Sequence, residues 1–251
     1  MMPANGTSRR ILGVNFFNGS ASEAVDRLEK GGLLVVPAAP ALKNLPRDPE
    51  YREALLQADL VITDSAFMVL VWNFLQRDSV KRLSGLEYLR EFIRRPDVCR
   101  GQGTFWIMAS PESAARNIDW MRSQGLTVEQ SDYYLAPMYG RPIEDRLLLH
   151  RLRERRPDHI IVTVGGGTQE RLGLYLKNNL DYPVAIHCVG AAIAFLSGDQ
   201  VYIPTWADKL YLGWLFRCVA DPKRYGPRYW DARHLMSLLV KYRERLPESQ
   251  L

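Results

Sequence analysis

Two stretches of this sequence hold residue types that could do chemistry, and the first ends at Asp64. This carboxylate follows the apolar run 60–63 and is the one acidic residue that we predict at the end of a strand. A strand end holds its side chains rigidly, so Asp64 is a candidate general base that would take a proton from a substrate. The alternative is an N-cap for a helix that begins near Ala66. The sequence leaves both roles open.

The second stretch is a glycine turn between a β-branched run and a helical pattern. Its polar and glycine positions are consecutive: Gly165, Gly166, Gly167, Thr168, Gln169 and Glu170. Glycines let the backbone approach a ligand closely, and N–H groups at a helix start favour an anion, so the turn is a candidate phosphate site. The spacing matches neither the dinucleotide-binding nor the P-loop pattern, and a tight turn without a ligand stays an alternative.

Alternating strands and helices position these two stretches. Hydrophobic patterning predicts strands over 11–16, 33–36, 60–63, 104–108, 127–130, 159–164 and 184–189. It predicts helices over 20–30, 49–58, 66–75, 84–94, 112–124, 144–155 and 171–178. A Ser20-x-x-Glu23 capping box and an Asp48-Pro49 pair mark two helix starts. This order predicts an α/β fold with a Rossmann-like, mostly parallel sheet and helices on both faces.

Ligands of such sheets bind outside the carboxyl ends of the strands. We therefore expect the proline-rich, rigid loop 37–40, Asp64, segment 109–110, the turn 165–170 and the small-residue turn at Gly190 to lie at one edge. Their convergence would make a single site.

Composition narrows the class of protein. The 251 residues are 47% hydrophobic and 24% charged, which is typical of a soluble globular protein, and the net charge of +5 suggests an anionic partner. Three distant cysteines and four histidines without ligand spacing predict no disulfide and no metal site. The apolar run near the start is too short for a signal peptide, and no run of 18 apolar residues occurs, so we expect a cytoplasmic protein that does not span a membrane.

The last fifth of the chain differs in character, and we predict a boundary that divides 1–204, an α/β domain, from 205–251, a helical appendage. The appendage is rich in aromatic residues and carries nine Lys/Arg against five Asp/Glu, a net of +4. Its segment 234–246 has an apolar face. Basic amphipathic helices with aromatic residues suit an anionic membrane surface. The alternative is a helix packed on the core or on another subunit.

Five segments resemble, in order, the signature segments of one family. They are 58–65 (ADLVITDS), 81–85 (KRLSG), 156–170 (RPDHIIVTVGGGTQE), 214–217 (WLFR) and 222–229 (PKRYGPRY). From about residue 33 to residue 229 the chain resembles the WecG/TagA/CpsF glycosyltransferases, glycosyltransferase family 26. It departs from the family pattern in three segments: Pro37-Ala38-Ala39-Pro40 replaces Thr-Pro-Asn-Pro, Gly167-Thr168 replaces Pro-Lys, and Ile193-Ala194-Phe195 replaces Phe-Asp-Phe.

The resemblance implies an inverting glycosyltransferase of cell-envelope polysaccharide synthesis. It would move a sugar from a nucleotide-diphosphate donor, UDP by expectation, to a polyprenyl-diphosphate-linked saccharide, without a metal or other cofactor. Asp64 would be the base. The substrate-binding residues would be Arg82, Gly85, Gly165, Gly166, Gly167, Thr168, Gln169, Glu170, Gly190, Arg217 and Arg224, with the arginines on the diphosphate. The expected partners are the two substrates, an anionic membrane at the inner face of the cell membrane and a second copy of the chain, but not nucleic acid.

Two other functions stay open. Alanines at 38, 39 and 194 are compatible with a nucleotide-sugar-binding homologue of weakened activity. An NAD-dependent oxidoreductase would share the sheet, but it would need G-x-G-x-x-G after its first strand, and Phe17-Asn18-Gly19-Ser20 lacks that pattern.

Overall fold

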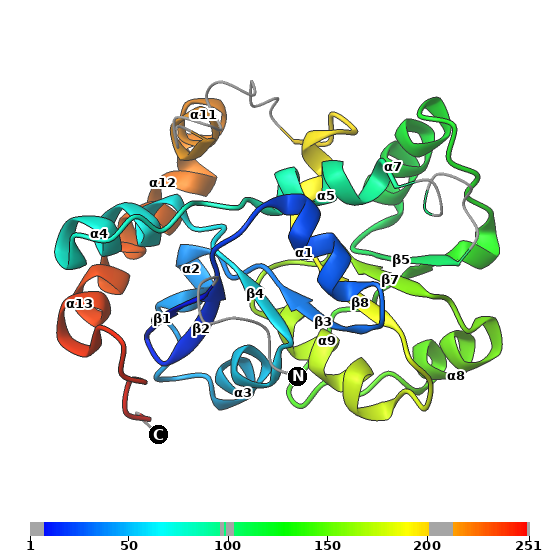
Figure 1. Ribbon diagram of the computed structural model, residues 1–251. Coiled ribbons are helices and arrows are strands. Elements are labelled where there is room, and N and C mark those ends of the chain that lie inside the picture. Colours follow the sequence, from blue (N-terminus) through cyan, green and yellow to red (C-terminus); the bar gives the residue numbers. More distant parts are fainter. Residues whose placement is uncertain (1–7, 96–97, 99–102, 201–212, 250–251) are drawn as a thin grey trace.

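The computed structural model describes residues 8–95, 98, 103–200 and 213–249 (Figure 1). Within the last of these ranges, the side chains of six residues are outside the description: Trp214, Arg217, Arg224, Tyr225, Arg228 and Tyr229. The predicted boundary at residue 204 also lies outside the described residues, so the division into 1–204 and 205–251 stays a prediction.

The described residues form one eight-stranded sheet in the order β1-β2-β4-β3-β8-β7-β5-β6. The strands are β1 (Ser8–Ile11), β2 (Val14–Phe17), β3 (Gly32–Val35), β4 (Leu60–Ile62), β5 (Thr104–Met108), β6 (Tyr133–Leu135), β7 (His159–Val162) and β8 (Ala185–Cys188). Only β1 runs antiparallel to its neighbour, and the other pairings are parallel. The predicted mostly parallel α/β sheet is confirmed.

Helices cover both faces of the sheet (Figure 1). The α-helices are α1 (Ala21–Leu28), α2 (Ala39–Leu42), α3 (Pro49–Gln57), α4 (Ala66–Gln76), α5 (Gly85–Ile93), α7 (Pro111–Ser123), α8 (Arg146–Arg155), α9 (Thr168–Asn179), α11 (Gly213–Ala220), α12 (Pro222–Asp231) and α13 (Arg233–Tyr242). The structure also describes two short 3-10 helices, η1 (Gln130–Asp132) and η2 (Gly190–Phe195). The predicted Ser20–Glu23 capping box is present, and the Asp48 side chain caps α3.

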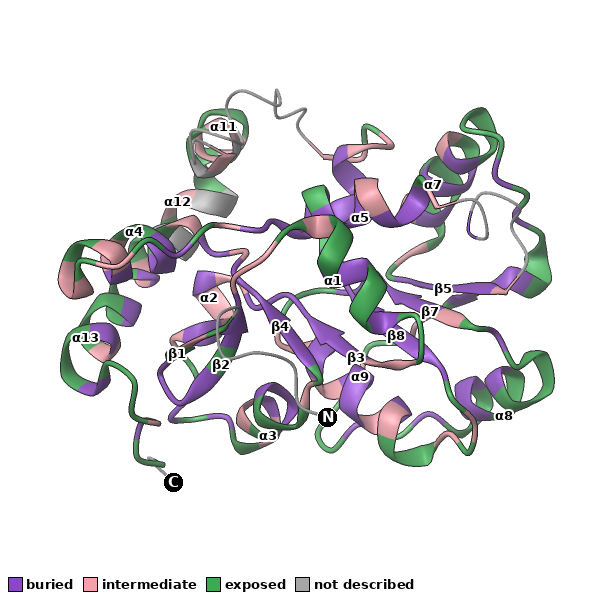
Figure 2. Ribbon diagram, viewed as in Figure 1, coloured by how far each residue is buried: buried purple, intermediate pink, exposed green. Residues whose placement is uncertain are grey.

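Two hydrophobic clusters fill the space between the sheet and its helices. The strands of the sheet are coloured mostly as buried in Figure 2. One cluster joins the sheet to α1, α5 and α7. The other joins it to α3, α4, α8 and α9 and also takes in α13 through Leu235, Leu239 and Tyr242. These three residues belong to the apolar face predicted for segment 234–246. That face of α13 therefore packs on the core of the same chain, which was one of the alternatives to a membrane contact.

Two strand predictions need correction. The predicted strand 11–16 is interrupted by the turn of the β1–β2 hairpin, because Leu12 and Gly13 adopt φ angles of 51° and 78° and reverse the chain; residues 14–16 do lie in β2, and Ile11 ends β1. Segment 127–130 is not a strand. The Asp132 carboxylate accepts a hydrogen bond from the Glu129 backbone and pairs with Arg155, so a side chain satisfies backbone groups that a strand would use, and β6 begins only afterwards.

The C-terminal segment pairs with the N-terminal hairpin. The Leu12 N–H donates to the Arg243 carbonyl at 2.7 Å, and the Gly13 N–H donates to the Glu244 carbonyl at 3.0 Å. Within the described residues, no helix combines the length and the apolar character that crossing a bilayer requires.

Candidate active site

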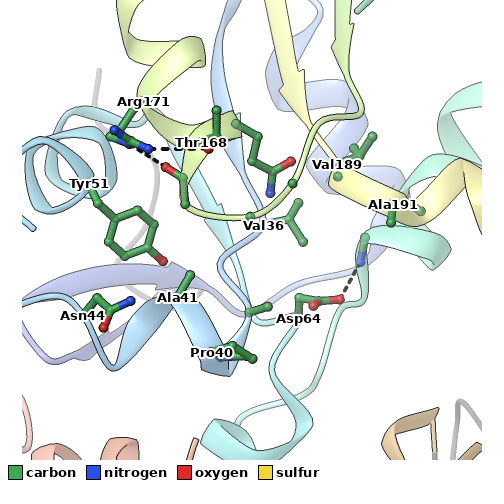
Figure 3. Close-up of a pocket in the computed structure, with 18 of the residues that line it drawn as sticks. Val36, Pro40, Ala41, Asn44, Tyr51, Asp64, Thr168, Arg171, Val189 and Ala191 are labelled. Carbon is green, nitrogen blue, oxygen red and sulfur yellow. Dashed lines mark hydrogen bonds between the residues drawn. The ribbon is translucent and has the colours of Figure 1, made fainter. Parts of the chain in front are cut away.

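A cavity of about 620 Å³ opens where four neighbouring parallel strands end (Figure 3). The segments that follow β3, β4, β7 and β8 line it with Val36, Ala38, Asp64, Gly165, Gly166, Gly167, Val189 and Gly190. The expected convergence of strand ends is therefore present for these four segments, whereas segment 109–110, which follows β5, does not line the cavity. Segment 37–40 is only partly the rigid loop we expected, because α2 begins at Ala39.

Asp64 follows β4 and points into this cavity (Figure 3). It is not the N-cap of α4: Ser65 has that role, with its hydroxyl accepting a hydrogen bond from the Met68 N–H at 3.1 Å. Asp64 Oδ1 accepts a hydrogen bond from the Gly85 N–H at 3.0 Å, and the side chain keeps 28% of its surface exposed. The carboxylate is thus fixed by one contact and still open to a ligand.

Arg82 and Gly85 hold this carboxylate from the next segment of the chain. Arg82 Nε donates to the Asp64 backbone carbonyl at 2.8 Å, and its Nη2 lies 4.0 Å from Asp64 Oδ1. A Cβ at Gly85 would lie 3.0 Å from Val36 Cγ1, so glycine allows the close approach that brings its N–H to Asp64. The Arg82 guanidinium therefore places a fixed positive charge beside the candidate base Asp64.

The glycine turn faces open space. A Cβ at Gly165, Gly166 or Gly167 would meet no heavy atom within 4 Å, which leaves room for a ligand against the loop. Several backbone donors are already used inside the turn. The N–H groups of Thr168 and Gln169 donate to the Gly165 carbonyl. The helix start therefore offers fewer donors to a phosphate than its sequence suggested.

Glu170 supports the turn and does not line the cavity. Its side chain has no exposed surface, and its Oε2 accepts a hydrogen bond from the Gly167 N–H at 2.7 Å. Burial raises the pKa of the Glu170 carboxyl to about 7, against the opposing effect of its hydrogen bonds. The structure therefore places Glu170 under the loop, whereas the family resemblance implied that Glu170 binds substrate.

The remaining predicted residues have different outcomes. Thr168, Gln169 and Gly190 line the cavity with the turn. Gly190 has a φ of 58°, and a Cβ there would lie 3.1 Å from Gln169 Oε1, so glycine makes room for that amide. The side chains of Arg217 and Arg224 lie outside the description, and their role in binding diphosphate stays a prediction.

Several lining residues escaped the sequence analysis, among them Asn44, Tyr51, Arg141 and Arg171. Arg171 Nε donates to the Gly167 carbonyl at 2.9 Å and its guanidinium pairs with Glu50, so it fastens the turn to α3. Its position one residue after the predicted turn was a usable signal. The others lie in helices or loops far from any strand end, where the sequence pattern gives no signal.

No group of three His, Cys, Asp or Glu side chains within the described ranges is placed to hold a metal ion. The cavity is lined by glycine backbone, by polar side chains and by charged side chains of both signs. Arg141 pairs with Asp48, Lys43 pairs with Asp231 and Arg171 pairs with Glu50, whereas Asp64 lies near Arg82 and keeps part of its surface open to a ligand. Such a site can take a proton and stabilise an anion at neighbouring points.

Residues 9–249 match the Glycosyl transferase WecG/TagA/CpsF family, which covers nearly the whole chain. The chain belongs to this family. Similar proteins include the N-acetylglucosaminyldiphosphoundecaprenol N-acetyl-beta-D-mannosaminyltransferases of Staphylococcus aureus strains NCTC 8325 / PS 47 and MRSA252. Each is 25% identical over 226 residues, which cover 86% of this chain and 86% of the relative.

Membership of the WecG/TagA/CpsF family confirms the resemblance and the enzyme class: the protein is a glycosyltransferase. It also removes the NAD-dependent oxidoreductase as an alternative. The cavity at the strand ends is the candidate active site of this transferase.

Proposed function

We propose that the protein transfers a sugar from a UDP-sugar to a saccharide linked to a polyprenyl diphosphate, with inversion at the anomeric carbon. The observation that carries this proposal is Asp64, held at a strand end in the cavity and placed near Arg82. The relatives' names specify an acceptor of this class and an N-acetylmannosaminyl group. At 25% identity we carry over the class of acceptor and leave the sugar to experiment.

The geometry supports a single displacement. The Asp64 carboxylate takes the proton from the acceptor hydroxyl while that oxygen forms a bond to the anomeric carbon. The bond between that carbon and the donor diphosphate breaks on the opposite face. The leaving diphosphate carries away the electron pair, and the Arg82 guanidinium stabilises its negative charge.

A panel of UDP-sugars with a short-chain lipid-linked acceptor tests the proposal directly. Product formation with one donor, and release of UDP in equal amount, is the expected result. Donor binding without turnover on any acceptor would instead favour the homologue of weakened activity.

Transfer is expected to survive exhaustive chelation. The chain has no D-x-D motif, and Arg82 is placed to supply the positive charge that a metal gives other transferases. The measurement is product formation before and after chelator treatment, with a metal-dependent transferase as the positive control. An activity that disappears and returns with magnesium or manganese would contradict this expectation.

We also propose that the protein rests on an anionic bilayer with α4 against the lipid. Met68, Val69 and Trp72 bury one face of α4. The other face exposes Phe67, Leu70 and Phe74, which are 37%, 52% and 85% exposed.

The location of α4 favours a bilayer as the occupant of this face. The helix begins two residues after Asp64. A bound lipid-linked acceptor would therefore have its saccharide near the candidate base and its polyprenyl chain beside α4. The helix α13 packs against α4 and adds exposed Met236 and Val240. Nearby, Arg233 stacks on the exposed Trp230 ring at 4.5 Å, a pairing suited to the interface of an anionic membrane.

Replacing Leu70 and Phe74 together with serine is expected to weaken binding to anionic vesicles by at least about tenfold, since each apolar side chain buried in lipid contributes about 1.5–3 kcal/mol. Vesicle co-sedimentation measures the loss. The matched control is Leu147→Ser, at a residue on α8 that is 54% exposed. Unchanged sedimentation of the double variant, together with loss of a dimer in solution, would assign this face to a second copy of the chain.

A further inference from the structure

The cavity holds two buried polar atoms that have nothing to bond. Among the side chains that the structure describes, only Tyr51 Oη, Gln169 Oε1 and Arg95 Nε are buried without a hydrogen-bond partner. Tyr51 and Gln169 both line the cavity, although they are only 1% and 2% exposed. A buried polar atom without a partner costs free energy, so two in one cavity indicate that a ligand supplies the missing bonds.

Both side chains are held in place by their own helices. The Tyr51 backbone N–H donates to the Asp48 side chain that caps α3, and the hydroxyl points into the cavity (Figure 3). Gln169 Nε2 donates to Glu170 Oε1 at 3.1 Å, which fixes the amide and turns its oxygen away from that carboxyl. Burial and the nearby Glu170 carboxylate raise the pKa of Tyr51, so its hydroxyl keeps its proton.

The chemistry of the two atoms selects a neutral group. Gln169 Oε1 can only accept a hydrogen bond, so it repels phosphate oxygens and needs a ligand that brings an O–H or N–H. The guanidinium groups at this end are already paired with carboxylates, Arg171 with Glu50 and Arg141 with Asp48. This end of the cavity therefore suits hydroxyl or amide groups, whereas the end near Arg82 suits the diphosphate.

We infer that the Tyr51 hydroxyl and the Gln169 carbonyl form a subsite for neutral hydroxyl or amide groups of the nucleotide-sugar donor, with Tyr51 as a specificity-determining residue. This inference rests on the proposed function. The groups belong either to the transferred sugar or to the nucleoside, which share this chemistry.

The test is Tyr51→Phe, titrated by calorimetry with UDP-N-acetylmannosamine and with UDP. Loss of one neutral hydrogen bond should weaken binding by about 3- to 10-fold. The variant should be as thermally stable as the wild type or more stable, because it removes an unpartnered buried hydroxyl. The control is Tyr182→Phe: Tyr182 lies outside the cavity and donates to the Leu152 carbonyl, so this change should lower the melting temperature and leave binding unchanged.

The outcomes separate the subsite from the function. A loss for UDP-N-acetylmannosamine alone places the bonded group in the sugar, and an equal loss for UDP places it in the nucleoside. Equal affinity of variant and wild type for both ligands overturns the subsite. If the wild type binds neither ligand, the proposed donor class fails, and the subsite inference, which rests on that donor class, fails with it.

Discussion

Replacing Asp64 with asparagine is expected to lower turnover by a factor on the order of 10²–10⁴ while the fold and donor affinity are retained. Asparagine keeps an oxygen that can accept the hydrogen bond from the Gly85 N–H, and its volume is almost the same. It cannot take the proton of the acceptor hydroxyl. The measurement is single-turnover product formation, together with calorimetric titration of the donor.

Asp59→Asn is the matched control for this variant. Asp59 precedes β4, and Asp64 follows the same strand at its other end. Asp59 accepts a hydrogen bond from the Leu33 N–H at 2.7 Å and pairs with Lys177, so its replacement should lower stability without lowering turnover. Near-normal turnover in a folded Asp64→Asn protein would remove Asp64 from the role of base.

Deleting residues 205–251 is expected to unfold the protein. The strands predicted from the sequence all precede that segment, and on that ground alone residues 1–204 would be expected to stay folded without it. In the structure, Leu235 and Leu239 are completely buried in the cluster that contains Trp72 on α4. Removing one such leucine costs about 2–5 kcal/mol, and a whole domain has only about 5–15 kcal/mol of stability.

A graded pair of substitutions tests the same contact without deletion. Leu239→Ala should cost about 2–5 kcal/mol of unfolding free energy, whereas Val240→Ala, at the neighbouring position that is 49% exposed, should cost much less. Chemical unfolding of the two variants measures the difference. A truncated protein that unfolds cooperatively at the wild-type temperature would show that α13 is dispensable.

The sequence located the candidate base and the glycine turn because strand ends are visible in hydrophobic patterning and parallel strands share one edge. It could not locate Tyr51, since a tyrosine within a helix has the same pattern whether its hydroxyl meets a ligand or the core. Nor could it assign the apolar face of α13. Lipid and protein interior are both apolar, so amphipathic spacing is the same for either neighbour.

The sequence also did not show which residues hold the glycine turn in place. Glu170 and Arg171 follow the glycine turn directly, yet one is buried beneath it and the other fastens its carbonyl to α3. The order of residues shows that both lie close to the turn, but it does not show in which direction their side chains point. That direction depends on how α9 packs on α3, a contact between distant segments of the chain.

The pairing of residues 12 and 13 with residues 243 and 244 sets a time scale for synthesis. Ribosomes add roughly 5–20 residues per second, so the first hairpin waits on the order of ten seconds to a minute for the segment that completes its contacts. During that interval the Leu12 and Gly13 N–H groups lack the carbonyls of residues 243 and 244, and the side of α4 that later receives α13 is still uncovered. Association with other chains through these groups is therefore open until α13 and the residues after it have emerged.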